Sequence, residues 1–362
     1  MVIFFVGTVA ELIKLFPIMK QMEEEGRPFK IVATGQNDLT QSDLMEHLKT
    51  SVTLSLSKDK IKQSTFGVLL WFMRTLLSAY FKMRREMVPE RPRVDILVVH
   101  GDTVSTLMGS LLGRLLGFRV AHIEAGLRSF KIFSPFPEEI CRRLVSKLVE
   151  IHFCPNDWAV GNLSQHTGKK ICTNGNTLID SFRYSQIIPI VSPMIHSLRQ
   201  QPYFVFVIHR QENIYNEALV TSLITQILMK IKDGLTCFML LHEPTRIAFD
   251  SFGLMANLEK IDHLIISPRL KYFEFMQVLG GAEFIVTDGG SNQEETFYLG
   301  KPCLILRTAT ERTEGLGHNV LLSGCDYSLI AAFLADYRKY ARDPQDLNVS
   351  PSTIVCQKLM LL

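Results

Sequence analysis

Short apolar runs alternate with longer, helix-like stretches along the whole chain. In the first half, apolar runs at 2–6, 31–34, 94–99 and 119–123 predict strands, and the stretch 104–116, rich in small residues, predicts a helix. These runs lack a strict two-residue alternation, which is typical of parallel strands covered by helices on both faces.

The second half repeats the pattern, with predicted strands at 203–208, 237–241, 263–266, 284–287 and 302–306. Strands that alternate with helices predict parallel sheets with crossover helices. The predicted fold class is therefore α/β, with two Rossmann-like, doubly wound domains that face a cleft.

Two domains are also expected from the length, since 362 residues correspond to about two typical domains. We place the N-terminal domain at 1–175 and the C-terminal domain at 176–342, with a turn-rich linker near 173–193. The tail, 343–362, opens with Pro344 and ends in an apolar stretch, so we expect it to pack back on the N-terminal domain.

Composition and charge narrow the class of protein. A chain that is 47% hydrophobic and 21% charged is not disordered, and a net charge of +3 is too small to indicate a nucleic-acid partner. The seven cysteines include no C-x-x-C pair, which indicates a reduced, cytoplasmic protein without a thiolate metal site. The amino terminus has no basic region before its apolar run, so it predicts a first strand rather than a signal peptide.

One apolar segment, 66–81, is interrupted by Arg74 and is shorter than the roughly 20 residues that a membrane span requires. Basic residues follow it at Lys82, Arg84 and Arg85. We expect a helix that packs on its own domain or on a second subunit. The alternative is a helix that lies on a membrane surface through 66–85.

Acidic residues follow two of the predicted strands in the first half. Asp102 comes after the strand 94–99, and Glu124 comes directly after 119–123. Ligands bind beyond the carboxyl ends of parallel strands, and clustered acids in a partly dry site raise at least one pKa into the range of general acid–base catalysis. Glu138 follows Pro137 at a predicted helix start and is a third candidate, although a carboxylate there also serves as a simple cap.

The second half places hydrogen-bond donors at its predicted strand ends. His209 and Arg210 follow one strand, and both donate to phosphate oxygens. Gly289, Gly290 and Ser291 follow another strand, where glycines let a ligand approach the backbone, the serine can cap a helix, and free amides bind anions. Thr310 and Arg312 add donors after the next strand. This half therefore predicts a site for a nucleotide diphosphate.

Three common sites are not supported. The stretch from Gly7 to Lys14 is not a G-x-G-x-x-G fingerprint, and the chain has no G-x-x-x-x-G-K-[ST] loop. His242-Glu243 lacks the second histidine of a zinc protease.

In order along the chain, the motifs are Gly7-Thr8…Glu11…Lys14, His100-Gly-Asp102, His122-Ile-Glu124-Ala-Gly-Leu-Arg128, Pro137-Glu138-Glu139, His209-Arg-Gln-Glu-Asn213, Asp288-Gly-Gly-Ser-Asn-Gln-Glu-Glu295 and Thr310-Glu-Arg312. This order resembles the UDP-N-acetylglucosamine 2-epimerases over nearly the whole chain. The resemblance implies a fold of the glycosyltransferase-B type, a UDP-sugar in the interdomain cleft, a homodimer, and no nicotinamide cofactor or metal.

The resemblance also implies the chemistry. In the family, UDP is eliminated with loss of the C2 proton to give a bound 2-acetamidoglucal, and UDP then adds back with the proton delivered to the other face. Asp102, Glu124 and Glu138 match the catalytic acids, and His209 and Lys14 match positions that contact the leaving diphosphate. Further expected contacts to the UDP-sugar are Arg128, Arg210, Asn213, Gly289, Gly290, Ser291, the ribose-binding carboxylate Glu295, and Arg312.

The chain departs from the family pattern in four places. Val9-Ala10 stands where an Arg-Pro pair is usual, and the serine of the glycine loop is displaced to Ser291. Gln36-Asn37-Asp38 stands where a Gln-His-Arg segment is usual, and 58–92 departs most. In part of the family the last two regions help to build an activating UDP-N-acetylglucosamine site, which we do not expect here.

The leading hypothesis is a non-hydrolysing 2-epimerase for surface polysaccharide synthesis. Alternatives are a hydrolysing epimerase, a glycosyltransferase of the same fold, and a binding module without turnover.

Overall fold

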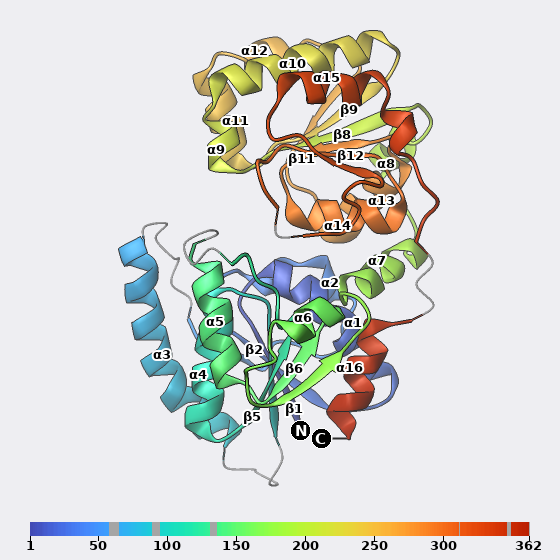
Figure 1. Ribbon diagram of the computed structural model, residues 1–362. Helices are drawn as coiled ribbons and strands as arrows, with labels where there is room; N and C mark the ends of the chain where they lie inside the picture. The colour runs from blue at the N-terminus through green and yellow to red at the C-terminus, as the bar shows by residue number, and fades with distance from the viewer. Residues whose placement is uncertain (58–64, 89–94, 131–135, 311, 346–348, 362) are drawn as a thin grey trace. The chain divides into compact units, whose positions relative to one another are not determined.

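The computed structural model describes residues 1–361 apart from 58–64, 89–94, 131–135, 311 and 346–348. The chain divides into two compact units (Figure 1): unit 1 comprises Met1–Tyr184 with Asn348–Leu362, and unit 2 comprises Ser185–Leu347. Each unit holds one parallel sheet with helices between its strands, so the predicted α/β class with two Rossmann-like domains is confirmed. The division falls within α7 (Leu178–Ile187), inside the stretch that the sequence marked as a linker.

The sheet of unit 1 has the strand order β3-β2-β1-β4-β5-β6-β7. Its strands are β1 (Val2–Val6), β2 (Phe29–Ala33), β3 (Leu54–Ser55), β4 (Ile96–His100), β5 (Arg119–Ile123), β6 (Ile151–Cys154) and β7 (Lys169–Cys172). Sequence order reverses between β1 and β4, which pair in parallel with Val2 beside Ile96. Such a reversal opens a crevice at the carboxyl ends of the two strands, where ligands bind in open α/β sheets.

The helices of unit 1 are α1 (Val9–Glu24), α2 (Asp43–Glu46), α3 (Thr65–Met87), α4 (Val104–Leu116), α5 (Glu138–Leu148), α6 (Asp157–Gly161), most of α7, and α16 (Pro351–Met360), with a 3-10 turn at Leu39–Gln41. Figure 1 shows α3, α4 and α5 side by side on one face of the sheet, and α1 beside α16 on the other. Helix α4 has the bounds that the sequence predicted. Thr103 caps its start, and Gly117 ends it in a left-handed conformation that suits glycine.

The tail contributes α16 to unit 1. The Ser352 amide donates to Asp180 Oδ2 at 2.8 Å, and the Cys356 thiol lies 3.5 Å from the carbonyl oxygen of Ile18 in α1. The last helix of the chain is therefore packed on the first.

Helix α3 contains the apolar segment that the sequence singled out. One face, with Trp71, Ala79 and Met83, is buried in the core of unit 1. The opposite face leaves four large apolar side chains exposed, at Leu70, Met73, Leu77 and Phe81. The predicted helix is confirmed, and it packs on its own domain through only one of its faces.

The sheet of unit 2 has the strand order β10-β9-β8-β11-β12-β13. Its strands are β8 (Tyr203–Val207), β9 (Thr236–Leu240), β10 (Leu264–Ser267), β11 (Ile285–Thr287), β12 (Cys303–Ile305) and β13 (Val320–Leu322). Its helices are α8 (Pro193–Leu198), α9 (Gln211–Ile214), α10 (Glu217–Lys232), α11 (Glu243–Ser251), α12 (Met255–Leu258), α13 (Tyr272–Gly281), α14 (Gly290–Leu299) and α15 (Tyr327–Ala335), with a 3-10 turn, η2, at Tyr337–Tyr340. Here the sequence order reverses between β8 and β11.

Every predicted strand is present, with ends that differ by a residue or two. Four strands were not predicted: β3, β6, β7 and β13. Two of them, β3 and β13, are only two and three residues long, and β7 begins with two lysines. Strands β3, β7 and β13 gave no clear apolar run because they lie at the edges of their sheets. Strand β6 is an interior strand of four residues that include His152.

Candidate active site

Glu124 is the centre of the polar group in unit 1. It follows β5 in a left-handed backbone conformation with φ 64°, which is uncommon for a residue with a side chain and is found at functional sites. Its Oε1 accepts hydrogen bonds from Lys14 Nζ at 2.7 Å and from Asn176 Nδ2 at 2.6 Å, and its Oε2 lies 3.5 Å from His100 Nε2. The side chains of Lys14 and Glu124 are only 7 and 8% exposed.

Asp102 follows β4, the neighbouring strand. Its carboxylate pairs with the guanidinium of Arg142, which lies only 3.5 Å from the fully buried Glu139 as well. Glu139 in turn accepts from the Ser129 amide and from Arg143. Glu139 therefore helps to fix the position of Arg142, the arginine that pairs with Asp102.

Glu138 is the first residue of α5. Its Oε2 is buried, and it has no hydrogen-bond partner within the described part of the chain. Asp102 and Glu138 both face the Cys141 thiol, and together with burial, the larger cause, they raise the pKa of that thiol to about 12. Oε2 of Glu124 lies beside Gly101, next to Asp102. The structure thus brings the three predicted acids to one edge of the sheet of unit 1; Ser134 and Pro135, which precede Glu138, lie outside the described residues.

Two further residues of this group had no predicted role. Asn176 holds Glu124, as described above, and its only sequence signal was the turn-forming run Thr173-Asn-Gly-Asn176. Glu11 is buried, and its Oε2 accepts from the Gly7 amide at 2.6 Å, while its other oxygen accepts from the Thr103 hydroxyl. Burial is the main cause that raises the pKa of Glu11 to about 7, and nearby Asp102 adds to the rise.

Arg128 and His122 are both buried in unit 1. Arg128 donates to the carbonyl oxygen of Leu127 and to Ser146 Oγ at 2.7 Å, so its guanidinium is engaged inside unit 1. His122 Nε2 lies 2.7 Å from the Gly101 carbonyl oxygen, and burial lowers the pKa of this histidine to about 3. Both residues brace the strand-end loops that carry Asp102 and Glu124.

Asp288, fully buried after β11, organises the predicted donors of unit 2. Its carboxylate accepts from the backbone amides of His209 and Arg210 at 3.0 to 3.1 Å and from Asn213 Nδ2 at 3.0 Å. The His209 ring nitrogen Nδ1 lies 3.2 Å from the same carboxylate. The loops after β8 and β11 are therefore held together by one acid, which the sequence placed in a motif without a role.

The His209 ring stacks on the His242 ring, with centroids 5.2 Å apart. Burial lowers the pKa of His209, and the charge of Asp288 opposes that shift. The pKa of His242 is lowered to about 4, again mainly by burial. Arg210 donates through Nε to the Asp288 carbonyl oxygen at 3.0 Å.

The start of α14 differs from the prediction in one respect. Gly289, not Ser291, is the N-cap residue, and no side chain caps the helix. Ser291 lies two residues further on, in the first turn, because Gly290 already has helical geometry. The proposed role of Ser291 as a cap is therefore wrong, and the N-cap residue supplies no side-chain acceptor to the first amides of α14. A Cβ on Gly289 would lie 2.5 Å from Asn292 Oδ1 and 3.3 Å from His209 Cε1, so a side chain at this position would displace Asn292.

Glu295 and Arg312 lie behind this helix start. The buried Glu295 accepts from Asn292 Nδ2 at 3.0 Å. Arg312 pairs with the fully buried Glu294, and Gln293 bonds the main chain at Arg312 and the hydroxyl of Thr310. These contacts hold the loop after β12 against α14. Glu311, in the centre of this loop, lies outside the described residues.

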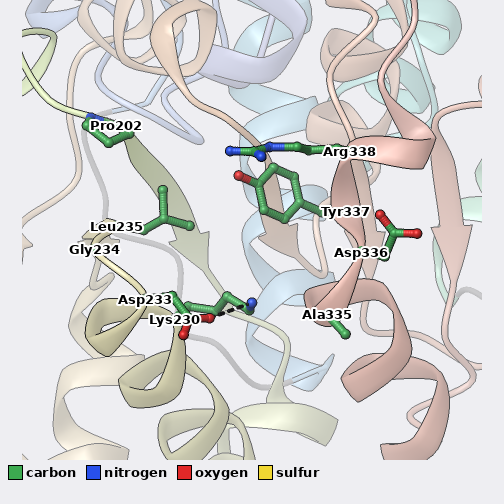
Figure 2. Close-up of a pocket in the computed structure, with 9 residues that line it drawn as sticks. All are labelled: Pro202, Lys230, Asp233, Gly234, Leu235, Ala335, Asp336, Tyr337 and Arg338. Atoms are coloured by element: carbon green, nitrogen blue, oxygen red, sulfur yellow. Dashed lines mark hydrogen bonds and ion pairs between the residues drawn. The ribbon is translucent and has the colours of Figure 1, made fainter.

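A cavity of about 350 Å³ lies at the other end of the sheet of unit 2 (Figure 2). Pro202 and Leu235 line it just before β8 and β9 begin. Its charged side chains are of both signs, and Lys230 pairs with Asp233 at 2.8 Å in its wall. The cavity is far along the strands from His209 and does not take part in the site.

Within the residues that the structure describes, no helix is long and apolar enough to cross a membrane. In the same part of the chain, no group of three His, Cys, Asp or Glu side chains is arranged to hold a metal ion.

Known proteins resemble this chain over most of its length. The sequence profile of the UDP-N-acetylglucosamine 2-epimerase family matches residues 20–347. A UDP-N-acetylglucosamine 2-epimerase of Methanococcus maripaludis is 31% identical over 335 residues, which cover 88% of this chain and 87% of that protein. A UDP-2,3-diacetamido-2,3-dideoxy-D-glucuronate 2-epimerase of Pseudomonas aeruginosa is 31% identical over 258 residues, or 69% of this chain and 70% of the relative.

The crystal structure of UDP-GlcNAc 2-epimerase from Neisseria meningitidis bound to UDP-GlcNAc is 26% identical and superposes with a TM-score of 0.83, covering 100% of this chain and 99% of that one. The two parallel sheets with alternating helices are thus the two-domain α/β fold of the glycosyltransferase-B type. Within that class, the chain belongs to the UDP-N-acetylglucosamine 2-epimerase family.

Proposed function

We propose that this protein converts UDP-N-acetylglucosamine to UDP-N-acetylmannosamine by eliminating and re-adding UDP. The observation that carries the proposal is the group of carboxylates in unit 1, in which Glu124 is held by Lys14 and Asn176 beside Asp102 and Glu138. An isomerisation at a carbon next to the anomeric centre needs proton transfer on both faces of the sugar, and several carboxylates supply it.

The proposed reaction has two steps. In the first, a carboxylate takes the C2 proton, the bond from C1 to the UDP oxygen breaks, and the electron pair of the C–H bond forms the C1–C2 double bond of 2-acetamidoglucal. In the second, the UDP oxygen attacks C1 and a second carboxyl group delivers a proton to the other face of C2. Glu138 is suited to exchange a proton because its Oε2 makes no hydrogen bond to the described residues.

Unit 2 is assigned to the nucleotide. His209, Arg210 and the uncapped amides of α14 supply donors for the diphosphate, whose negative charge grows as the C1–O bond breaks. We assign Lys14 to the leaving diphosphate as well, and the buried Glu295 to the ribose. Asn213, Gly290, Ser291, Arg128 and Arg312 complete the proposed UDP-sugar site, the last two by supporting its loops.

The product separates a non-hydrolysing from a hydrolysing enzyme. The protein is incubated with UDP-N-acetylglucosamine, and the products are resolved by anion-exchange chromatography. We expect UDP-N-acetylmannosamine with the nucleotide still attached. Free N-acetylmannosamine with UDP would contradict the non-hydrolysing mechanism, and hydrolysis with retention at C2, or no reaction, would contradict epimerisation itself.

The same assay includes UDP-2,3-diacetamido sugars, because a relative from Pseudomonas aeruginosa carries that substrate in its name. We propose N-acetylglucosamine as the sugar and surface polysaccharide as its destination. A deletion strain is then expected to lack N-acetylmannosamine-derived units in its surface polysaccharide.

We also propose that the protein acts as a homodimer through the exposed face of α3. Leu70, Met73, Leu77 and Phe81 are 41 to 65% exposed there, and a contiguous apolar surface of this kind marks an interface. Leu77→Glu should halve the mass measured by light scattering, and Ile247→Glu, at an exposed residue of α11, should not. A monomeric wild type that binds anionic vesicles would instead favour the membrane-surface alternative.

A further inference from the structure

Glu11 lies at the point of unit 1 where the sequence order of the strands reverses. It belongs to the first turn of α1, directly after β1, and its side chain is buried. Its Oε2 accepts from the amides of Gly7 and Thr8, and its Oε1 accepts from the Thr103 hydroxyl after β4. One carboxyl group therefore ties together the two turns that border the crevice.

Thr103 links the Glu11 carboxyl group to Asp102. It is the N-cap residue of α4, where its side chain also accepts from the Thr106 amide, and it directly follows Asp102 in the chain. The two turns are in close contact elsewhere too, since a Cβ on Gly7 would lie 2.2 Å from Ser105 Oγ. We therefore expect a displacement of either turn to displace Asp102 as well.

Asp102 is also the charged group that faces Glu11 from the second turn. On α1 itself the nearest cation is Lys14, and its ammonium group is bound to Glu124. Burial raises the pKa of Glu11 to about 7, against the hydrogen bonds from Thr103, Gly7 and Thr8, which lower it. The carboxyl group thus changes charge near neutral pH beside a proposed catalytic acid.

We propose that Glu11 is a positioning residue for Asp102, which it holds through Thr103 and whose charge it influences across the crevice. The inference deepens the proposed epimerase reaction and rests on it. The reaction requires Asp102 to be placed and charged correctly, and a misplacement of about 1 Å can cost a large factor in rate.

The test is a set of pH–rate profiles for wild type and two substitutions. Glu11→Gln keeps the shape of the side chain and removes its ionisation. We expect kcat to fall about 10-fold with KM and the Kd of UDP unchanged, and the step in the pH dependence of kcat near pH 7 to disappear. Thr103→Val should lower kcat similarly and move that step to higher pH, because the hydroxyl that lowers the pKa of Glu11 is lost.

Two controls separate positioning from simple loss of stability. Thr103→Ser keeps the hydroxyl and should restore both kcat and the step. Asp95→Asn changes another buried carboxylate, paired with the Met1 amino group at 2.8 Å before β4 begins, and should lower stability while the step stays in place. A step that survives in Glu11→Gln, or one that vanishes in Asp95→Asn, would overturn the proposal.

A second readout does not depend on activity. Between pH 4.5 and about 7 the folded state holds a proton on Glu11 that the unfolded state has lost, so wild type loses stability relative to Glu11→Gln as pH rises through this range. Urea midpoints of the two proteins should therefore diverge with pH. An inactive wild type would contradict the proposed function. Urea midpoints that change with pH in the same way in wild type and Glu11→Gln would contradict the role assigned to Glu11.

Discussion

The two units share one architecture and carry opposite chemistry at their strand ends. In unit 1 the reversal between β1 and β4 is bordered by acids, of which Asp102 and Glu124 are the centre. In unit 2 the corresponding reversal between β8 and β11 is bordered by donors, namely His209, Arg210 and the first amides of α14. The proposed function assigns proton transfer to the acids of unit 1 and the diphosphate to the donors of unit 2.

A buried carboxyl group holds the loops together in both cases. Asp288 in unit 2 accepts from two backbone amides and from the side chain of Asn213, and the His209 ring nitrogen Nδ1 lies 3.2 Å from its carboxylate. Glu11 in unit 1 accepts from two amides and one hydroxyl and has Asp102 as its charged neighbour. The buried acid of unit 2 is therefore surrounded by donors, whereas the buried acid of unit 1 lies beside a second carboxylate.

The largest effects are expected for the acids of unit 1. Asp102→Asn, Glu124→Gln and Glu138→Gln should each lower kcat by about 10²- to 10⁴-fold, as for the loss of a general acid or base, while the Kd of UDP stays nearly constant. Steady-state kinetics and calorimetric titration with UDP measure the two quantities. Glu150→Gln, at a half-exposed ion pair with Arg114, is the matched control, and normal turnover in all three variants would refute the assignment.

The next largest effect is expected for the stability of Asp288→Asn. Asp288→Asn leaves three hydrogen-bond donors and the neighbouring His209 ring with a weaker acceptor at a fully buried site, so unit 2 should lose about 3 kcal/mol of unfolding free energy. Urea denaturation measures this loss. Asp326→Asn, at the cap of α15, should have little effect because Asn and Asp cap helices equally well. Equal losses of unfolding free energy in the two variants would show that the hydrogen bonds to Asp288 stabilise unit 2 no more than an ordinary helix cap does.

A smaller effect is expected for Gly289→Ala. The added methyl group would meet Asn292 and the His209 ring, and we expect UDP to bind about 10-fold more weakly, or about 1.4 kcal/mol. In Gly280→Ala the nearest atom of another residue, Arg199 Nη2, is 3.5 Å away, so UDP should bind normally. Unchanged affinity in Gly289→Ala would remove the start of α14 from the proposed diphosphate site.

The smallest effect concerns two buried histidines of unit 1. His122 and His152 are neighbours on β5 and β6, and burial lowers their pKa values to about 3 and about 4 from 6.5. Because only the unfolded state takes up their protons below pH 6.5, their contribution is complete above that pH and is lost as pH falls. The free energy of unfolding should therefore drop by at most about 1.4 kcal/mol per pH unit for each histidine.

Urea titrations from pH 7 to 5 on wild type and His152→Gln isolate one of these contributions. The substitution should flatten the pH dependence, and His318→Gln, at an exposed position, should leave it unchanged. A slope that is the same in all three proteins would show that His152 takes up its proton equally in the folded and unfolded states.

Sequence patterns predicted the central, apolar strands with the exception of β6, which contains His152. They missed β7 because its Lys169-Lys170 start lies on an edge strand, and they misplaced the cap of α14 because a glycine pair allows the helix to begin before Ser291. Candidate acids could be named because they follow apolar runs directly. Asn176, Asp288 and Glu11 received no role, since their importance comes from hydrogen bonds to residues far away in the sequence.

The central claim is that the carboxylates of unit 1 exchange the proton at C2 of a UDP-bound sugar. Proton NMR of the protein with UDP-N-acetylglucosamine in D2O tests it directly, by following deuterium at C2 together with the sugar species that form. We expect deuterium at C2 in UDP-N-acetylmannosamine and in the recovered substrate. Retention of the proton at C2 in every sugar species would contradict it.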